Sequence, residues 1–144
     1  MKQRHWRNHP NDFKMNSNHC ILVVEAEHDF RQLTAEALME AGYQVETAYD
    51  EAGAWAALQT SQYDLLIIDQ FIPLVSGIEL LKKIHTSGVA LPIIMTTGFS
   101  MIAEFARHPY LQPVKLIFKP CSFEKLLIMV RHSLSESVST QDKY

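Results

Sequence analysis

The clearest structural signal in the sequence is the apolar run Leu65-Leu66-Ile67-Ile68, which ends directly at Asp69. A strand that is apolar at every position has both faces buried, as in a parallel sheet covered by helices on its two sides. A second run of this kind, Cys20-Ile21-Leu22-Val23-Val24, lies nearer the N-terminus. The two runs indicate an α/β protein built around a parallel sheet.

Amphipathic stretches separate the apolar runs. Residues 29–41 carry apolar side chains at i, i+3, i+7, i+8 and i+11, which is the spacing of one helix face. Asp29 is the expected N-cap of this helix, and Gly42 stands where a helix commonly ends.

The same alternation continues along the chain. Further strands are expected at residues 44–48, 63–68, 92–96 and 115–118, and further helices at residues 50–59, 76–85, 101–107 and 122–134. Asp50 and Ser122 are the expected N-caps of two of these helices. Five β-α units joined by right-handed crossovers predict a three-layer, doubly wound (βα)5 fold. Right-handed crossovers leave few possible strand orders for its five-stranded parallel sheet.

The composition fits one globular domain. The chain has 144 residues, of which 47% are hydrophobic and 20% are charged, and its net charge is -3. This composition allows a sizeable core, excludes an acidic disordered chain and lacks the basic character that nucleic-acid binding favours. We expect a domain at residues 19–134, a disordered tail at residues 1–18 and a flexible tail at residues 135–144.

Cysteine use and hydropathy give a first expectation of the compartment. The two cysteines, Cys20 and Cys121, form neither a disulfide framework nor a metal-binding spacing. No apolar stretch approaches the roughly 18 residues that a membrane span needs, and the N-terminus lacks the apolar region of a signal peptide. We therefore expect a cytoplasmic protein with no membrane partner.

Polar residues follow the predicted strands at the edge where ligands bind in open parallel sheets. They are Glu25, Ala26 and Glu27 after the first strand, Asp69 after the third, Thr97 and Gly98 after the fourth, and Lys119 and Pro120 after the fifth. An ionised aspartate can attack phosphorus and form an acyl phosphate. A divalent cation and a lysine ammonium would neutralise the phosphoryl oxygens, and a threonine hydroxyl could donate a hydrogen bond to one of them.

Four segments resemble the receiver domains of bacterial response regulators. They are Ile21-Leu22-Val23-Val24-Glu25-Ala26-Glu27, Asp69-Gln70-Phe71-Ile72-Pro73-Leu74-Val75-Ser76-Gly77, Leu91-Pro92-Ile93-Ile94-Met95-Thr96-Thr97-Gly98 and Lys115-Leu116-Ile117-Phe118-Lys119-Pro120. Each motif is weak by itself, but all four coincide with predicted strand ends. The resemblance extends over residues 20–134, and it implies the flavodoxin-like strand order 2-1-3-4-5 for the five-stranded parallel sheet.

The resemblance implies a role for each matching residue. Asp69 would accept a phosphoryl group from a histidine kinase or a phosphotransfer protein. Glu25, Asp69 and the backbone carbonyl of Phe71 would bind Mg²⁺. Thr97 would contact the phosphoryl group, and Lys119 would pair with the aspartate or its phosphate. The bond between Lys119 and Pro120 would be cis.

The metal site departs from the family pattern. Receiver domains usually have two adjacent acids after the first strand, whereas this chain has Glu25 followed by Ala26. Alanine cannot ligate a metal, so we expect weak Mg²⁺ binding. Glu27 is a candidate substitute ligand, although a solvated loop charge explains it about equally well.

Two further departures concern the phosphorylated state. Leu116 stands where receivers usually carry Tyr or Phe, so the usual coupling of threonine and aromatic ring is in doubt. Phe71 and Phe99 lie two residues after Asp69 and Thr97, at positions that flank the phosphoryl group in the family. Bulky rings there should hinder an attacking water, which predicts a long-lived phosphoaspartate.

Three functions compete at this point. The first is a receiver, a signalling domain rather than an enzyme, which acts by surface change on a downstream protein. Residues 101–134 would form its output face or a homodimer contact, and we expect no DNA-binding domain in this chain. The second is a pseudo-receiver, an interaction module that works without phosphate, which Ala26 and Leu116 favour. The third is a flavodoxin-like cofactor binder or hydrolase, which no P-loop, GxGxxG motif or DxD after the third strand supports.

Overall fold

The structure is a computed structural model that describes residues 19–69, 77–98, 107 and 114–142. The elements are β1 (Cys20–Val24), α1 (His28–Glu40), β2 (Gln44–Ala48), α2 (Glu51–Thr60), β3 (Leu65–Asp69), α3 (Gly77–Ser87), β4 (Ile93–Thr97), β5 (Lys115–Phe118) and α5 (Phe123–Asp142). The five strands form one parallel sheet in the order β2-β1-β3-β4-β5, which confirms the predicted topology. The helix expected at residues 101–107 lies, except for Arg107, outside the described residues.

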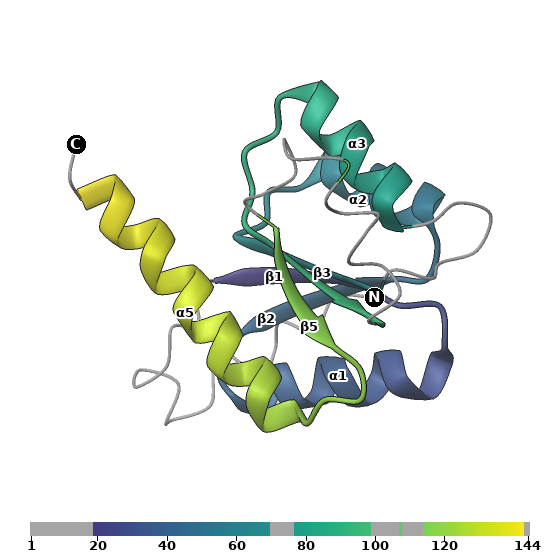
Figure 1. Cartoon of the computed structure of the whole chain (residues 1–144), viewed down its shortest axis with the longest axis vertical. Helices are drawn as coiled ribbons and strands as arrows, with labels where there is room; N and C mark the ends of the chain where they lie inside the picture. Colours follow the sequence, from purple (N-terminus) through teal and green to yellow (C-terminus); the bar gives the residue numbers. More distant parts are fainter. Residues whose placement is uncertain (1–18, 70–76, 99–106, 108–113, 143–144) are drawn as a thin grey trace.

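Helices cover both faces of the sheet, as Figure 1 shows, with α2 and α3 on one face and α1 and α5 on the other. Successive residues of a strand point to opposite faces. Leu22 accordingly belongs to the core beneath α2 and α3, whereas Val23 belongs to the core beneath α1 and α5. The apolar run of β3 is buried at every position. This two-sided burial is the physical reason for its uninterrupted apolar sequence.

The start of α1 corrects one prediction. Asp29 is not the N-cap, because Glu27 occupies that position and accepts hydrogen bonds from the backbone N–H groups of Phe30 (2.6 Å) and Asp29 (3.3 Å). The longer glutamate side chain reaches over the first turn, while Asp29 lies within that turn, where a negative charge suits the helix dipole. Gly42 follows the helix with φ 103, which confirms its predicted role.

The other two predicted caps are confirmed. Asp50 Oδ1 accepts from the backbone N–H of Gly53 at 2.8 Å, and Ser122 Oγ accepts from that of Lys125 at 3.1 Å. The predicted end of the last helix at residue 134 is wrong, because α5 continues to Asp142. Residues 135–142 contain neither proline nor glycine, so no residue of this segment interrupts the helical backbone. Within the described residues, no helix is long and apolar enough to cross a membrane.

Candidate functional site

The carboxyl ends of β1, β3 and β4 bring polar side chains to one edge of the sheet. Asp69 is the last residue of β3 and lies opposite Thr96 of β4. Glu25 directly follows Val24, which pairs with Ile68. Both β3 and β4 extend one residue further than predicted, so Asp69 and Thr97 are strand residues rather than loop residues. Asp69 and Glu25 are each only 6% exposed, so these carboxyl groups are held in a protected environment.

Lys119 joins this edge from the end of β5. Its Nζ donates a hydrogen bond to Asp69 Oδ2 at 2.8 Å, and the two groups form an ion pair. The backbone N–H of Lys119 donates to the carbonyl of Thr97 at 2.8 Å, which fixes the end of β5 beside β4. The bond between Lys119 and Pro120 is cis, as the resemblance implied. Lys119 therefore reaches Asp69 from a backbone that is itself anchored.

Glu25 shares the site with Asp69. Its Oε2 accepts from the backbone N–H of Glu27 at 3.0 Å. Burial, and next a hydrogen bond with the Asp69 carboxyl group, raise the pKa of Glu25 to about 7. The Glu27 N–H and the Lys119 ammonium oppose this rise. Two buried acids facing one ammonium make a site at which an additional positive charge would be favourable.

Thr97 completes the arrangement at the end of β4. It is 1% exposed, and its Oγ1 donates to the carbonyl of Gly98 at 3.3 Å. The neighbouring Thr96 lies beside Asp69 in the sheet register. The structure thus brings Glu25, Asp69 and Lys119 into one cluster and places Thr97 on the adjacent strand end. Phe71 and Phe99 lie outside the described residues, so the predicted carbonyl ligand and the predicted long phosphoaspartate lifetime stay predictions.

Comparison with known proteins identifies this arrangement. Residues 21–131 match the family model described as the response regulator receiver domain. The chain belongs to that family. Receiver domains of this kind are signalling domains of two-component systems, generally not enzymes, and they typically bind Mg²⁺ and interact with histidine kinases or phosphotransfer proteins.

Relatives and solved structures agree with the assignment. The receiver is 31% identical over 77% of its length to the transcriptional regulatory protein DltR of Streptococcus agalactiae, covering 50% of that protein. It is 28% identical over 77% of its length to the probable transcriptional regulatory protein SilR of Salmonella typhimurium, covering 49% of that protein. The chain thus spans about half the length of these curated relatives.

Its fold matches the chemotaxis response regulator CheY4 of Vibrio cholerae with a TM-score of 0.72 and 28% identity, covering 81% of this chain and 98% of that one. The receiver domain of NtrX from Brucella abortus matches with a TM-score of 0.72 and 28% identity, covering 80% and 98% of the two chains. Both matches extend over nearly all of the compared domain.

The receiver's acidic turn offers one carboxylate to a metal beside Asp69. Glu27, the candidate substitute ligand, uses its carboxylate as the N-cap of α1. The described residues hold no group of three or more His, Cys, Asp or Glu side chains that could bind a metal. Mg²⁺ sites commonly use one or two carboxylates together with water and phosphate oxygens. Glu25 and Asp69 therefore fit a Mg²⁺ ion at the lower limit of what such a site requires.

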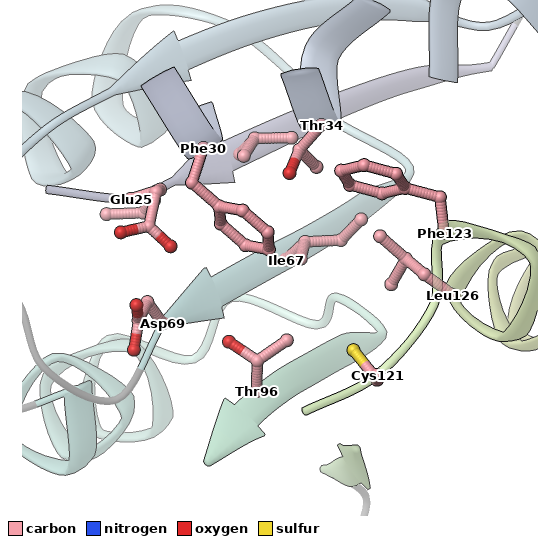
Figure 2. A pocket seen from close by; sticks show the side chains of 11 residues that line it. Glu25, Phe30, Thr34, Ile67, Asp69, Thr96, Cys121, Phe123 and Leu126 are labelled. Carbon is pink, nitrogen blue, oxygen red and sulfur yellow. The ribbon is translucent and has the colours of Figure 1, made fainter. Parts of the chain in front are cut away.

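A small cavity, which no pattern in the sequence predicts, extends from this pair of acids into the receiver. Figure 2 shows the Glu25 and Asp69 carboxyl groups at one end of it and Thr34 and Phe123 toward the other. Its volume of about 20 Å³ has room for about one water molecule. Thr34 is 3% exposed, and its Oγ1 is among the buried polar atoms of the described residues without a hydrogen-bond partner.

Arg31 is a further member of the site, and no motif in the sequence predicts its role. It extends from the first turn of α1 back to the acidic turn, where its Nη1 donates to the carbonyl oxygens of Glu25 (2.9 Å) and Ala26 (3.3 Å). The sequence signal that could have indicated this role is a basic residue one turn into a helix that follows a functional loop.

Leu116, in place of the usual aromatic residue, packs against the core beneath α2 and α3.

Proposed function

We propose that this receiver accepts a phosphoryl group on Asp69 from a histidine kinase or a phosphotransfer protein. The observation that carries the proposal is the 2.8 Å contact between Lys119 Nζ and Asp69 Oδ2 at the carboxyl edge of the sheet, beside Glu25. A buried carboxylate with an ammonium in direct contact and a second acid nearby supports phosphoryl transfer better than a purely structural role. A capping or structural aspartate would need neither partner.

The transfer requires little from the protein beyond position and charge. An Asp69 oxygen forms a bond to phosphorus while the P–N bond of the donor's phosphohistidine breaks, and the imidazole leaves with the electron pair and takes up a proton. Lys119 would stabilise the negative charge on the phosphoryl oxygens, and we expect the Thr97 hydroxyl to turn from the Gly98 carbonyl toward one of these oxygens. The product is an acyl phosphate on Asp69.

Mg²⁺ would be held by the Glu25 and Asp69 carboxylates, with the Phe71 carbonyl as the proposed third protein ligand. When bound, the ion supplies positive charge for the phosphoryl oxygens. Because Ala26 brings no carboxylate, we propose that the ion binds more weakly here than in receivers with two adjacent acids. Burial and the neighbouring Asp69 raise the pKa of Glu25, so a bound cation would favour the ionised form of this carboxyl group.

The output of the phosphorylated receiver would be a change of surface read by a downstream protein. The proposed surface covers about residues 101–134, and a homodimer through the same residues stays a prediction. Leu116 offers no aromatic ring to move between two environments, so we expect the response at β5 to be small. The boundaries of the domain at residues 19–134 are part of the same proposal.

The pseudo-receiver is the second candidate, favoured by Ala26 and Leu116. One experiment separates the two functions: incubation with acetyl phosphate and Mg²⁺, followed by intact mass spectrometry. A receiver gains the mass of one phosphoryl group, and Asp69→Asn gains none. If the wild-type protein gains no phosphate at any Mg²⁺ concentration, while circular dichroism shows it folded, the pseudo-receiver is correct.

A further inference from the structure

The acidic turn after β1 is held by Arg31, a residue that lies on the following helix. Its Nη1 donates to two successive carbonyl oxygens, those of Glu25 at 2.9 Å and Ala26 at 3.3 Å. Nη1 carries two N–H bonds, one for each carbonyl, while Nη2 of the same rigid guanidinium lies beside His28. The single nitrogen of a lysine ammonium cannot reach both sides in this way. The two bonds hold the backbone of the turn against the start of α1.

The guanidinium is itself held by two neighbours. Its Nη2 lies 3.1 Å from His28 Nδ1, and its Cζ lies 5.8 Å from the centre of the Tyr49 ring. That distance is within the range of a cation–π interaction. Tyr49 directly follows β2, and the carbonyl of its neighbour Ala48 accepts from the backbone N–H of Glu25 at 3.0 Å. The turn is therefore fixed to the β2 end both directly and through Arg31.

We propose that Arg31 is a positioning residue that fixes the Glu25 carboxylate for Mg²⁺, and this inference rests on the proposed function. Ala26 has no carboxylate and Glu27 caps α1, so within this turn Glu25 alone can offer an acid beside Asp69. A single ligand on a mobile turn would lose conformational freedom each time it bound the ion. A backbone fixed in advance removes that cost, as supporting residues do around other metal ligands.

The rival explanation is that Arg31 acts only as a nearby positive charge, and the two explanations predict opposite signs. Removing a cation from the neighbourhood of a divalent ion lowers the repulsion, so Mg²⁺ should bind more tightly. Removing a residue that positions the ligand should make Mg²⁺ bind more weakly. The direction of the change in Mg²⁺ affinity therefore separates the two roles.

The test is the Mg²⁺ dissociation constant measured by isothermal titration calorimetry for the wild type, Arg31→Gln and Arg131→Gln. Arg131 is an exposed residue of α5, so its substitution removes the same charge at a distance from the turn. We expect Arg31→Gln to weaken Mg²⁺ binding roughly tenfold, in the range found for residues that support metal ligands. Arg131→Gln should match the wild type. Unchanged or tighter binding by Arg31→Gln would overturn the proposal.

Two more variants address charge and folding. Arg31→Lys keeps the charge but loses the fork, so we expect it to resemble Arg31→Gln, and a full return of wild-type affinity would contradict the positioning role. Thermal unfolding without Mg²⁺ shows whether each variant is folded. If Arg31→Gln does not fold, Tyr49→Leu loosens the guanidinium while leaving the turn intact. Like Arg31→Gln, the Tyr49→Leu variant should bind Mg²⁺ more weakly than the wild type, by a few-fold. Unaltered Mg²⁺ affinity in Tyr49→Leu would contradict the proposal.

Phosphorylation by acetyl phosphate distinguishes failure of this inference from failure of the proposed function. We expect Arg31→Gln to need more Mg²⁺ for half-maximal phosphorylation, with little change in the rate at saturating Mg²⁺. If the wild type binds Mg²⁺ in an Arg31-dependent manner but takes up no phosphate, the phosphoacceptor function fails and the positioning role stands. Equal Mg²⁺ dependence in both proteins rejects the positioning role alone, and a wild type that binds no Mg²⁺ rejects both.

Discussion

The Lys119 ammonium lies 2.8 Å from Asp69 Oδ2, although the two residues are 50 positions apart in the chain. The parallel sheet makes this contact, because the ends of β3 and β5 face the same edge and a backbone hydrogen bond fixes Lys119 beside Thr97. Asp69 is 6% exposed while the Lys119 side chain is 40% exposed. The lysine therefore supplies positive charge from the solvent side to a carboxylate that is otherwise enclosed.

Loss of this ammonium should slow phosphorylation strongly. We expect Lys119→Gln to lower the rate of phosphate uptake from acetyl phosphate roughly a hundredfold, the size of effect seen when one preorganised group that stabilises charge is removed. Intact mass against time gives the rate. The matched control is Lys125→Gln, which removes the same charge from an exposed position on α5. Equal rates in Lys119→Gln and Lys125→Gln would show that Lys119 contributes only net charge.

The raised pKa of Glu25 predicts that stability falls with pH when Mg²⁺ is absent. The unfolded chain releases this proton near the ordinary pKa of 4.5, whereas the folded chain keeps it until the pKa of about 7. The folded state thus binds more protons between these values, and rising pH destabilises it, in total by at most about 3 kcal/mol. Urea unfolding at several pH values measures the effect. In Glu25→Gln this part of the pH dependence should vanish, and an identical slope in the variant would refute the assignment to Glu25.

An acid at position 26 should strengthen the metal site. We expect Ala26→Asp to bind Mg²⁺ at least roughly tenfold more tightly, because a second carboxylate joins the turn. Calorimetric titration measures the affinity, and the thermal midpoint with and without Mg²⁺ gives an independent reading. Gln32→Asp adds the same charge at an exposed position of α1 and serves as the control. The Mg²⁺ affinity of the wild type must be well below that of Ala26→Asp. Equally tight binding by both proteins would mean that the missing acid has no effect on the metal site.

The buried hydroxyl of Thr34 should destabilise the fold. Valine has nearly the same shape without the unpaired polar group, so Thr34→Val should raise the free energy of unfolding by about 1 kcal/mol. Urea unfolding measures it, and Thr47→Val at an exposed position of β2 should change stability by less than about 0.5 kcal/mol. A destabilised Thr34→Val would instead indicate a bound water in the cavity beside Asp69 that bonds to the hydroxyl.

The sheet and the main members of the site could be predicted from the sequence, because both depend on simple patterns. Runs that are apolar at every position, such as the one ending at Asp69, have few alternatives to a buried parallel strand. Once the strands were placed, the meeting of Asp69 and Lys119 followed from the common edge. The strand ends were less certain, and Asp69 and Thr97 proved to be the last residues of β3 and β4.

The features that the sequence does not predict depend on how far particular side chains reach in the folded protein. Glu27 and Asp29 are both acids near the start of α1, and only the backbone path shows that Glu27 bonds to the first helical N–H groups. Arg31 turns back toward its own loop, where it donates to two backbone carbonyls and its guanidinium lies over the ring of Tyr49. The unpaired Thr34 hydroxyl arises from packing between α1 and the sheet. None of these leaves a periodic trace in the sequence.

The separate anchoring of the acidic turn has an evolutionary consequence. Glu25 is held by the Glu27 N–H, Glu27 by the first turn of α1, and the carbonyl of Ala26 by Arg31. None of these bonds uses the side chain at position 26, which is partly exposed. Selection could therefore remove and restore an acid there by single substitutions without dismantling the surrounding scaffold. In a lineage of such proteins, metal dependence would be a trait that drifts easily in both directions.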